Sequence, residues 1–186
     1  MPFAWQEIAT GSPIKIDSIV LPLTWQLVRS MGALEQQMNS LSRFLLESYC
    51  PRPTHKVTLT SVNSSGLSKS DGKFSAAQIA TRRFLHMLDN RCWGHGRRRK
   101  GYVVGCIASV EGLGSWENWH VHLTLTSPAH LNYWRFYEDV LKSAAKVSAF
   151  GKEVDIKPYS GPEWVDYCFK TGSDSWLVEC TRLAKP

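Results

Sequence analysis

Residues 119–125 read Trp-His-Val-His-Leu-Thr-Leu, and polar and apolar side chains alternate through this stretch. The alternation predicts a β-strand, because successive side chains of a strand point to opposite faces of a sheet. His120, His122 and Thr124 would share one face, and the apolar residues between them would point into a core. Two imidazoles on one face of a strand form half of a metal site.

A second strand is predicted over 102–111, where an apolar run ends at Glu111. The glycine-containing stretch 112–115 follows it, which is typical of an antiparallel hairpin. The hairpin would return Glu111 to the two histidines as a third ligand, with Glu117 of the connecting loop as the alternative. A His-His-carboxylate set suits Mg²⁺, Mn²⁺ or another transition ion and leaves positions open for substrate oxygens. The other interpretation is that the histidines are ordinary hydrogen-bonded side chains on a half-exposed strand.

A tyrosine and a lysine lie three residues apart in the stretch Tyr167-Cys168-Phe169-Lys170. On the helix predicted over 161–170 they would share one face. A tyrosine hydroxyl is a poor nucleophile near pH 7, since its free pKa is about 10. A nearby cation or metal helps to generate the phenolate, and the lysine can also neutralise charge on a phosphate. Alternatively, the pair is a partly buried aromatic beside a solvated lysine.

The remaining periodic patterns indicate an α+β domain. They predict helices over 23–49, 75–89 and 128–146, strands over 55–61 and 154–158, and irregular segments over 62–73 and 90–99. Helices and strands in this order favour an antiparallel sheet with helices packed on it. We expect residues 1–50 to form an N-terminal helical extension or cap, and residues 51–186 to form the domain that carries the chemistry.

The charge balance favours a polyanionic partner. Lys and Arg number 22 against 16 Asp and Glu, which gives a net charge of +6, and a basic excess leans toward nucleic acid. Four consecutive basic residues stand next to glycines and form a candidate phosphate contact: Arg97, Arg98, Arg99 and Lys100. A nuclear-type address and a solvated turn remain alternatives for this run.

The five cysteines contain no C-x-x-C pair, which favours free thiols in a reducing cytoplasm over a disulfide framework. The chain begins without a secretory signal pattern and lacks an uninterrupted apolar run of about 20 residues. We therefore expect a cytoplasmic protein that does not enter a membrane.

Three motifs, in this order, resemble those of the HUH endonuclease superfamily, in particular the one-tyrosine rolling-circle replication initiators (Rep proteins) of plasmids, phages and small viruses. The strand over 57–61 resembles the first motif, an apolar-threonine strand beside the active site. His120-Val121-His122 is similar to the HUH motif, and Tyr167 with Lys170 is similar to the Y-x-x-K motif. The resemblance covers about residues 54–172.

The resemblance implies a central antiparallel sheet of about five strands with flanking helices, and nicking and rejoining of single-stranded DNA at a replication origin. It implies that His120 and His122 bind Mn²⁺ or Mg²⁺, that Tyr167 forms a covalent 5′-phosphotyrosine, and that Lys170 positions or activates it. It points to Glu111 as the third ligand. The 186 residues leave no room for a helicase domain beside the nicking domain, so a host helicase is an expected partner.

Further DNA contacts are expected around the first motif and the hairpin. Thr58 and Thr60 would face the active site, and Trp119, like Trp116, would stack on unpaired bases or simply cover the hairpin. Three alternative functions remain open. They are a related HUH transposase or mobilisation relaxase, a non-catalytic nucleic-acid-binding protein, and a metal-dependent hydrolase in which Tyr167 is structural.

Overall fold

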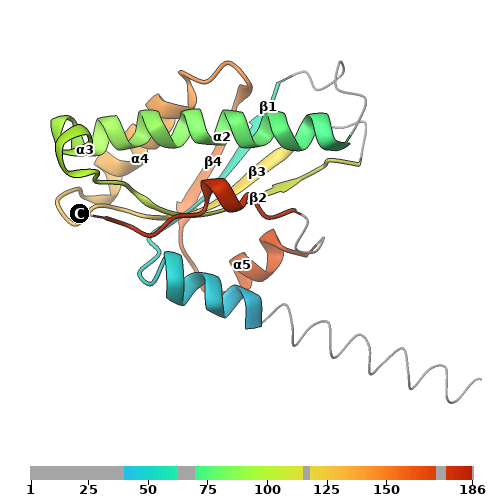
Figure 1. Ribbon diagram of the computed structural model, residues 1–186, viewed down its shortest axis with the longest axis horizontal. Helices are drawn as coiled ribbons and strands as arrows, with labels where there is room; N and C mark the ends of the chain where they lie inside the picture. Colours follow the sequence, from blue (N-terminus) through green and yellow to red (C-terminus); the bar gives the residue numbers. More distant parts are fainter. Residues whose placement is uncertain (1–39, 63–69, 115–117, 171–174, 186) are drawn as a thin grey trace, which may run out of the picture. The chain divides into compact units, whose positions relative to one another are not determined.

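Four antiparallel strands form the sheet at the centre of the fold, in the order β2-β3-β1-β4 (Figure 1). Their bounds are His55–Ser61 for β1, Gly105–Glu111 for β2, His120–Thr126 for β3 and Phe150–Pro158 for β4. The computed structural model describes residues 40–62, 70–114, 118–170 and 175–185, all within a compact unit formed by residues 40–186. The α+β class with one antiparallel sheet is confirmed.

The predicted count of about five strands is not confirmed, because the sheet of the described residues has four. The chain near the C-terminus lies along the outer edge of β2 instead. Cys106 and Arg182 exchange two backbone hydrogen bonds there, at 2.9 and 2.8 Å. The 3₁₀ helix η3 (Val178–Cys180) interrupts the pairing, so only isolated bridges form in place of a continuous strand.

Helices α2 (Ser70–Trp93) and α4 (Tyr133–Ala144) cover one face of the sheet (Figure 1). The strands contribute alternate residues to this core, as their period of two requires. Fully buried side chains from three elements meet there, among them Phe84 and Leu88 of α2, Val121, Leu123 and Leu125 of β3, and Phe136 and Val140 of α4. The residues between them on β3, including His122, therefore face the other way.

The opposite face of the sheet is covered over part of its area by α5 (Glu163–Cys168) and by the helical residues 40–49 (Figure 1). A second, smaller core joins them to β2. Its buried members include Leu45, Ile107, Val165 and Phe169. The predicted helix over 23–49 is confirmed only for residues 40–49, because residues 1–39 lie outside the described part of the chain.

The prediction of an irregular segment over 90–99 is wrong. Helix α2 continues to Trp93, and a short helix α3 (His95–Lys100) follows it. The Trp93 ring packs against Tyr102 and His130 at centroid distances of 5.0 and 4.7 Å, a long-range contact that holds the last turn of α2. Gly94 lies between the two helices, and its φ of 49° ends the helical conformation there.

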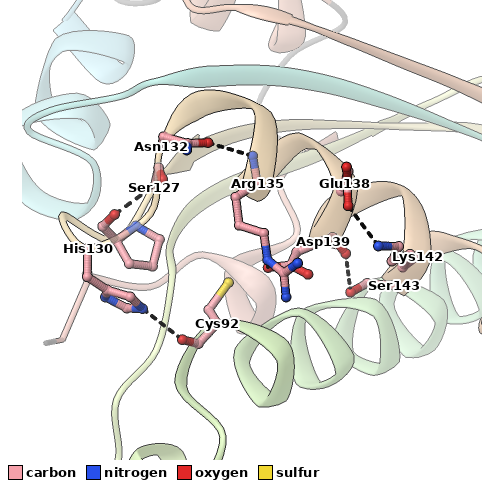
Figure 2. A network of polar contacts seen from close by, with 10 residues as sticks. Cys92, Ser127, His130, Asn132, Arg135, Glu138, Asp139, Lys142 and Ser143 are labelled. Atoms are coloured by element: carbon pink, nitrogen blue, oxygen red, sulfur yellow. Dashed lines mark hydrogen bonds and ion pairs between the residues drawn. The ribbon is translucent and has the colours of Figure 1, made fainter.

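Figure 2 shows the polar contacts that fix the start of α4 and join it to α2. The Asn132 side chain caps the helix by accepting a hydrogen bond from the Arg135 backbone N–H at 2.8 Å. This cap explains why α4 begins at Tyr133, whereas the sequence pattern predicted a start at residue 128. Before the cap, the ring of His130 bonds the Cys92 carbonyl near the end of α2 at 3.0 Å.

All five cysteines are free, as their spacing predicted, and all five are buried. Burial raises the pKa of the Cys50 and Cys92 thiols to about 12, so both stay protonated. Among the described residues, every helix is too short or too polar to cross a membrane.

Candidate active site

His120 and His122 lie on the same face of β3, and each meets a threonine of β1. Thr58 stands opposite His122 in the antiparallel register, and Thr60 stands opposite His120. His122 Nδ1 lies 3.2 Å from Thr58 Oγ1, and His120 Nδ1 lies 3.1 Å from Thr60 Oγ1. The threonines of the first motif therefore face the histidines and orient both rings.

Glu111 reaches the histidines from the last position of β2, where it stands opposite His120. One carboxylate oxygen accepts a hydrogen bond from His122 Nε2 at 2.9 Å. The other lies 2.8 Å from Lys170 Nζ. Glu111 thus connects the histidine strand to the segment that follows α5. Glu117, the alternative third ligand, lies outside the described residues.

Helix α5 holds Tyr167 against His122, with ring centroids 5.5 Å apart. The tyrosine remains accessible, since 44% of its surface is exposed. Lys170 lies beyond the end of the helix but still meets Tyr167, because its backbone N–H donates to the Tyr167 carbonyl at 3.2 Å. Its Nζ lies 4.0 Å from the centroid of the tyrosine ring. The buried ring of Phe169 anchors this turn to the second core.

Trp164 belongs to the same cluster, although the sequence analysis did not single it out. Its ring stacks on Tyr167 at a centroid distance of 5.6 Å and meets His122 edge to face at 5.5 Å. Lys56 Nζ lies 5.4 Å from the centroid of the tryptophan ring. The spacing of three residues between Trp164 and Tyr167 was the available signal, because it places both on one helix face.

Burial and the Glu111 contacts set the charges of the cluster. Burial lowers the pKa of His122, and the hydrogen bond to Glu111 offsets only part of this decrease. The imidazole is therefore neutral at neutral pH. Burial acts to raise the pKa of Glu111, but hydrogen bonds from Lys170 and His122 outweigh it and the pKa is lowered. Hydrogen bonds with Glu111 and Tyr167 raise the pKa of Lys170. The site therefore combines a neutral imidazole, a carboxylate and an ammonium group.

His120, His122 and Glu111 supply nitrogen and oxygen donors that suit Mn²⁺ or Mg²⁺ in their chemistry. Their side chains are not arranged around an ion, however. Across the described ranges, no three His, Cys, Asp or Glu side chains form a group placed to hold a metal. Both Glu111 oxygens are instead engaged, one by His122 and the other by Lys170. The four side chains His122, Glu111, Lys170 and Thr58 form a hydrogen-bonded network.

The basic residues 97–100 are not brought to this site. They form most of α3, beyond the C-terminal end of α2. The other end of α2 lies near Glu111, since Lys73 Nζ donates to the Gly112 carbonyl at 3.4 Å. A helix of 24 residues is about 36 Å long, which separates the two sites. Arg97 pairs with the buried Asp89 at 3.4 Å, Arg99 and Lys100 are exposed, and the Arg98 side chain lies outside the described part.

Trp119 packs in the core beneath the hairpin. Only 2% of its surface is exposed, and its ring meets Phe150 edge to face at a centroid distance of 5.8 Å. A ring in this position is not accessible to a nucleobase, so Trp119 covers the hairpin, the alternative that its sequence position left open. Trp116 lies outside the described residues.

Comparisons with protein-family models, with curated proteins and with solved structures find no match.

Proposed function

We propose that this chain is an HUH-type endonuclease that nicks single-stranded DNA through a tyrosine, in the manner of a one-tyrosine rolling-circle initiator. The observation that carries the proposal is the cluster formed by His122, Glu111, Tyr167 and Lys170, whose members lie in direct contact although β2, β3, α5 and the segment after α5 supply them. Glu111, His122 and Tyr167 are 11 to 56 positions apart in sequence and meet only because the fold brings them together.

The hydroxyl of Tyr167, a residue that is 44% exposed, is the proposed nucleophile. Its oxygen would attack the phosphorus of a phosphodiester, forming a bond to the 5′-phosphate while the bond to the 3′-oxygen breaks. The tyrosine proton passes to solvent, and the leaving oxygen takes a proton to become a free 3′-hydroxyl. The reverse reaction rejoins the strand. No water enters either step, so the energy of the phosphodiester is kept in the phosphotyrosine bond.

Lys170 is the proposed electrostatic partner of Tyr167. Its ammonium group lies over the tyrosine ring and is held by Glu111, so it is oriented before substrate arrives. A preorganised donor aimed at charge that develops in the transition state typically contributes about 10²- to 10³-fold in rate. Glu111 keeps this charge in place, and the raised pKa of Lys170 keeps it protonated.

A divalent ion would complete the site, held by His120, His122 and Glu111. When bound, it would polarise the scissile phosphate. Binding would require His122 Nε2 to give up its proton and its hydrogen bond to Glu111, and Glu111 to turn toward the ion, since only deprotonated groups bind metals. Thr58 and Thr60 fix the two imidazole rings from β1, which is the usual task of groups that hydrogen-bond to metal-binding histidines.

The test is covalent capture of DNA. Single-stranded oligonucleotides of mixed sequence, labelled at either end, are incubated with the protein and Mn²⁺ and resolved on a denaturing gel. We expect an adduct that carries the 3′ label and a released fragment that carries the 5′ label. Tyr167→Phe should abolish both. Tyr159→Phe is the matched control, because Tyr159 is another tyrosine near α5 and its hydroxyl has no hydrogen-bond partner within the described residues.

Each other outcome identifies a different function. Cleavage that survives Tyr167→Phe would favour a metal-dependent hydrolase, and an adduct that carries the 5′ label would contradict the proposed polarity. Binding without cleavage in Mn²⁺ and in Mg²⁺ would favour a non-catalytic nucleic-acid-binding protein.

A further inference from the structure

A basic cavity of about 470 Å³ opens beside α2, on the face of the sheet opposite the Tyr167 cluster. It lies between α2 and the segment that contains η3. Its charged or titratable lining residues are Arg82, Arg83, His86, Arg97, Glu179 and Arg182. The nicking chemistry uses none of these six side chains, so four arginines gathered around one cavity require a separate explanation.

Two of the arginines are held in place by a buried carboxylate. The Asp89 side chain is 0% exposed, and its two oxygens lie 2.6 Å from Arg182 Nη2 and 3.4 Å from Arg97 Nε. Asp89 also accepts a hydrogen bond from the Val104 N–H at 2.9 Å. A guanidinium has five N–H donors, so each arginine keeps donors for a ligand in the cavity. The floor of the cavity is thus a rigid pair of guanidinium groups.

The other two arginines form an exposed rim on α2. Arg82 lies 3.2 Å from Glu179, but their side chains are 64% and 60% exposed. An ion pair this exposed contributes little, so an anion can replace the carboxylate at small cost. Arg83 is exposed and makes no ion pair within the described part of the chain. The rim on α2 and the floor, formed by Arg97 of α3 and Arg182 of the C-terminal segment, together surround the cavity with positive charge.

We propose that this cavity binds the phosphate backbone of duplex DNA, as a second nucleic-acid contact separate from the nicking site. Arginine recognises phosphate through paired N–H donors, which explains the four arginines. None of the lining residues that the structure describes is Phe, Tyr or Trp, whereas single strands are typically held by stacking on such rings. A contact made through phosphates alone suits a duplex, whose backbone charges are regularly spaced.

The choice of DNA as the ligand rests on the proposed function. The inference that the arginines bind phosphate does not depend on it. A DNA substrate can carry a single-stranded segment next to duplex on the same molecule. An enzyme that holds single-stranded DNA at Tyr167 and duplex on α2 would therefore contact both parts of one substrate.

The experiment measures binding of a fluorescent blunt 20-base-pair duplex by anisotropy between 50 and 300 mM salt. The test variant carries Arg82→Gln and Arg83→Gln, which keep helix-forming side chains on α2. The matched control carries Lys142→Gln and Lys146→Gln, which remove two exposed charges near α4. Each lost phosphate contact reduces the slope of log K against log salt by about 0.9. The test variant should therefore lose about 1.8 from the slope and on the order of 10- to 60-fold in affinity at 0.1 M salt.

Two outcomes overturn the proposal. Equal losses in test and control variants would show a general effect of net charge, and an equal loss for a single-stranded 20-mer would show that the cavity does not select duplex. Arg83→Gln alone provides a second variant if the double substitution unfolds the chain, and its slope should change by about 0.9.

The nicking proposal is tested independently of the proposed duplex contact. Tyr167→Phe should bind the duplex with unchanged affinity, and the Arg82→Gln/Arg83→Gln variant should still form the covalent adduct on a short single strand. Loss of that adduct in a folded variant would contradict the separation of the two sites.

Discussion

Acid is expected to destabilise this protein through His55, a buried histidine at the start of β1. Only 1% of its surface is exposed. Its ring stacks on Tyr133 at a centroid distance of 4.6 Å and meets Phe136 at 4.8 Å. Burial lowers the pKa of His55 from 6.5 to about 4, which a backbone hydrogen bond with Tyr133 only partly offsets. The folded chain therefore holds a neutral imidazole in a place that disfavours charge.

The sign of the effect follows from proton linkage. The unfolded chain binds a proton on His55 more tightly than the folded chain, so the folded state is stabilised above pH 6.5 and loses this contribution as the pH falls toward 4. Between pH 7 and pH 4.5, we expect His55 alone to remove about 2–3 kcal/mol from the free energy of unfolding.

The assay is urea denaturation at pH 7 and pH 4.5 for the wild type and for His55→Phe. Phenylalanine keeps the aromatic packing and removes the titration, at a cost of about 1 kcal/mol at pH 7 for the hydrogen bond to Thr54. On going to pH 4.5, the wild type should lose about 2–3 kcal/mol more than the variant. His86→Phe, at an exposed position, should follow the wild type. Equal acid losses in the wild type and in His55→Phe would refute the reasoning.

Two further predictions concern the Tyr167 cluster. Glu111→Gln should weaken Mn²⁺ binding, measured by calorimetry, by at least about 10-fold, since even groups that only orient metal ligands contribute that much. The control is Glu47→Gln, which alters a pair of exposed side chains. Unchanged affinity in Glu111→Gln would show that this carboxylate is not a metal ligand. Phe169→Ala should lower the free energy of unfolding by about 3–5 kcal/mol, because the ring is fully buried beside α5. Phe44→Ala, at a side chain that is 53% exposed, should cost far less, and similar losses in the two variants would show that the second core does not hold α5.

Predictions that depend on local periodicity agree with the structure. The alternation in residues 55–61 and 119–125 correctly assigned the strands and the shared face of His120 and His122. The hairpin correctly returned Glu111 to the histidines. Each of these depends only on the two-residue repeat of a strand and on a short connection, both of which are visible in the sequence.

Predictions that depend on packing were less successful. The helices within residues 90–100 depend on contacts of Trp93 with residues that follow it in the chain. Trp119 lies in the core because it packs against Phe150 of β4. The C-terminal segment covers the edge of β2 without forming a fifth strand, because η3 interrupts the pairing.

The sequence by itself determined the class of the fold, the faces of its strands and the candidate residues of the site. Only the tertiary structure decided which of these residues meet. Glu111 binds Lys170 and His122 at once, Trp164 stacks on Tyr167, and the basic residues of α3 lie at the other end of α2. Periodicity specifies the direction in which a side chain points, whereas its neighbours are selected by burial of distant segments against one another.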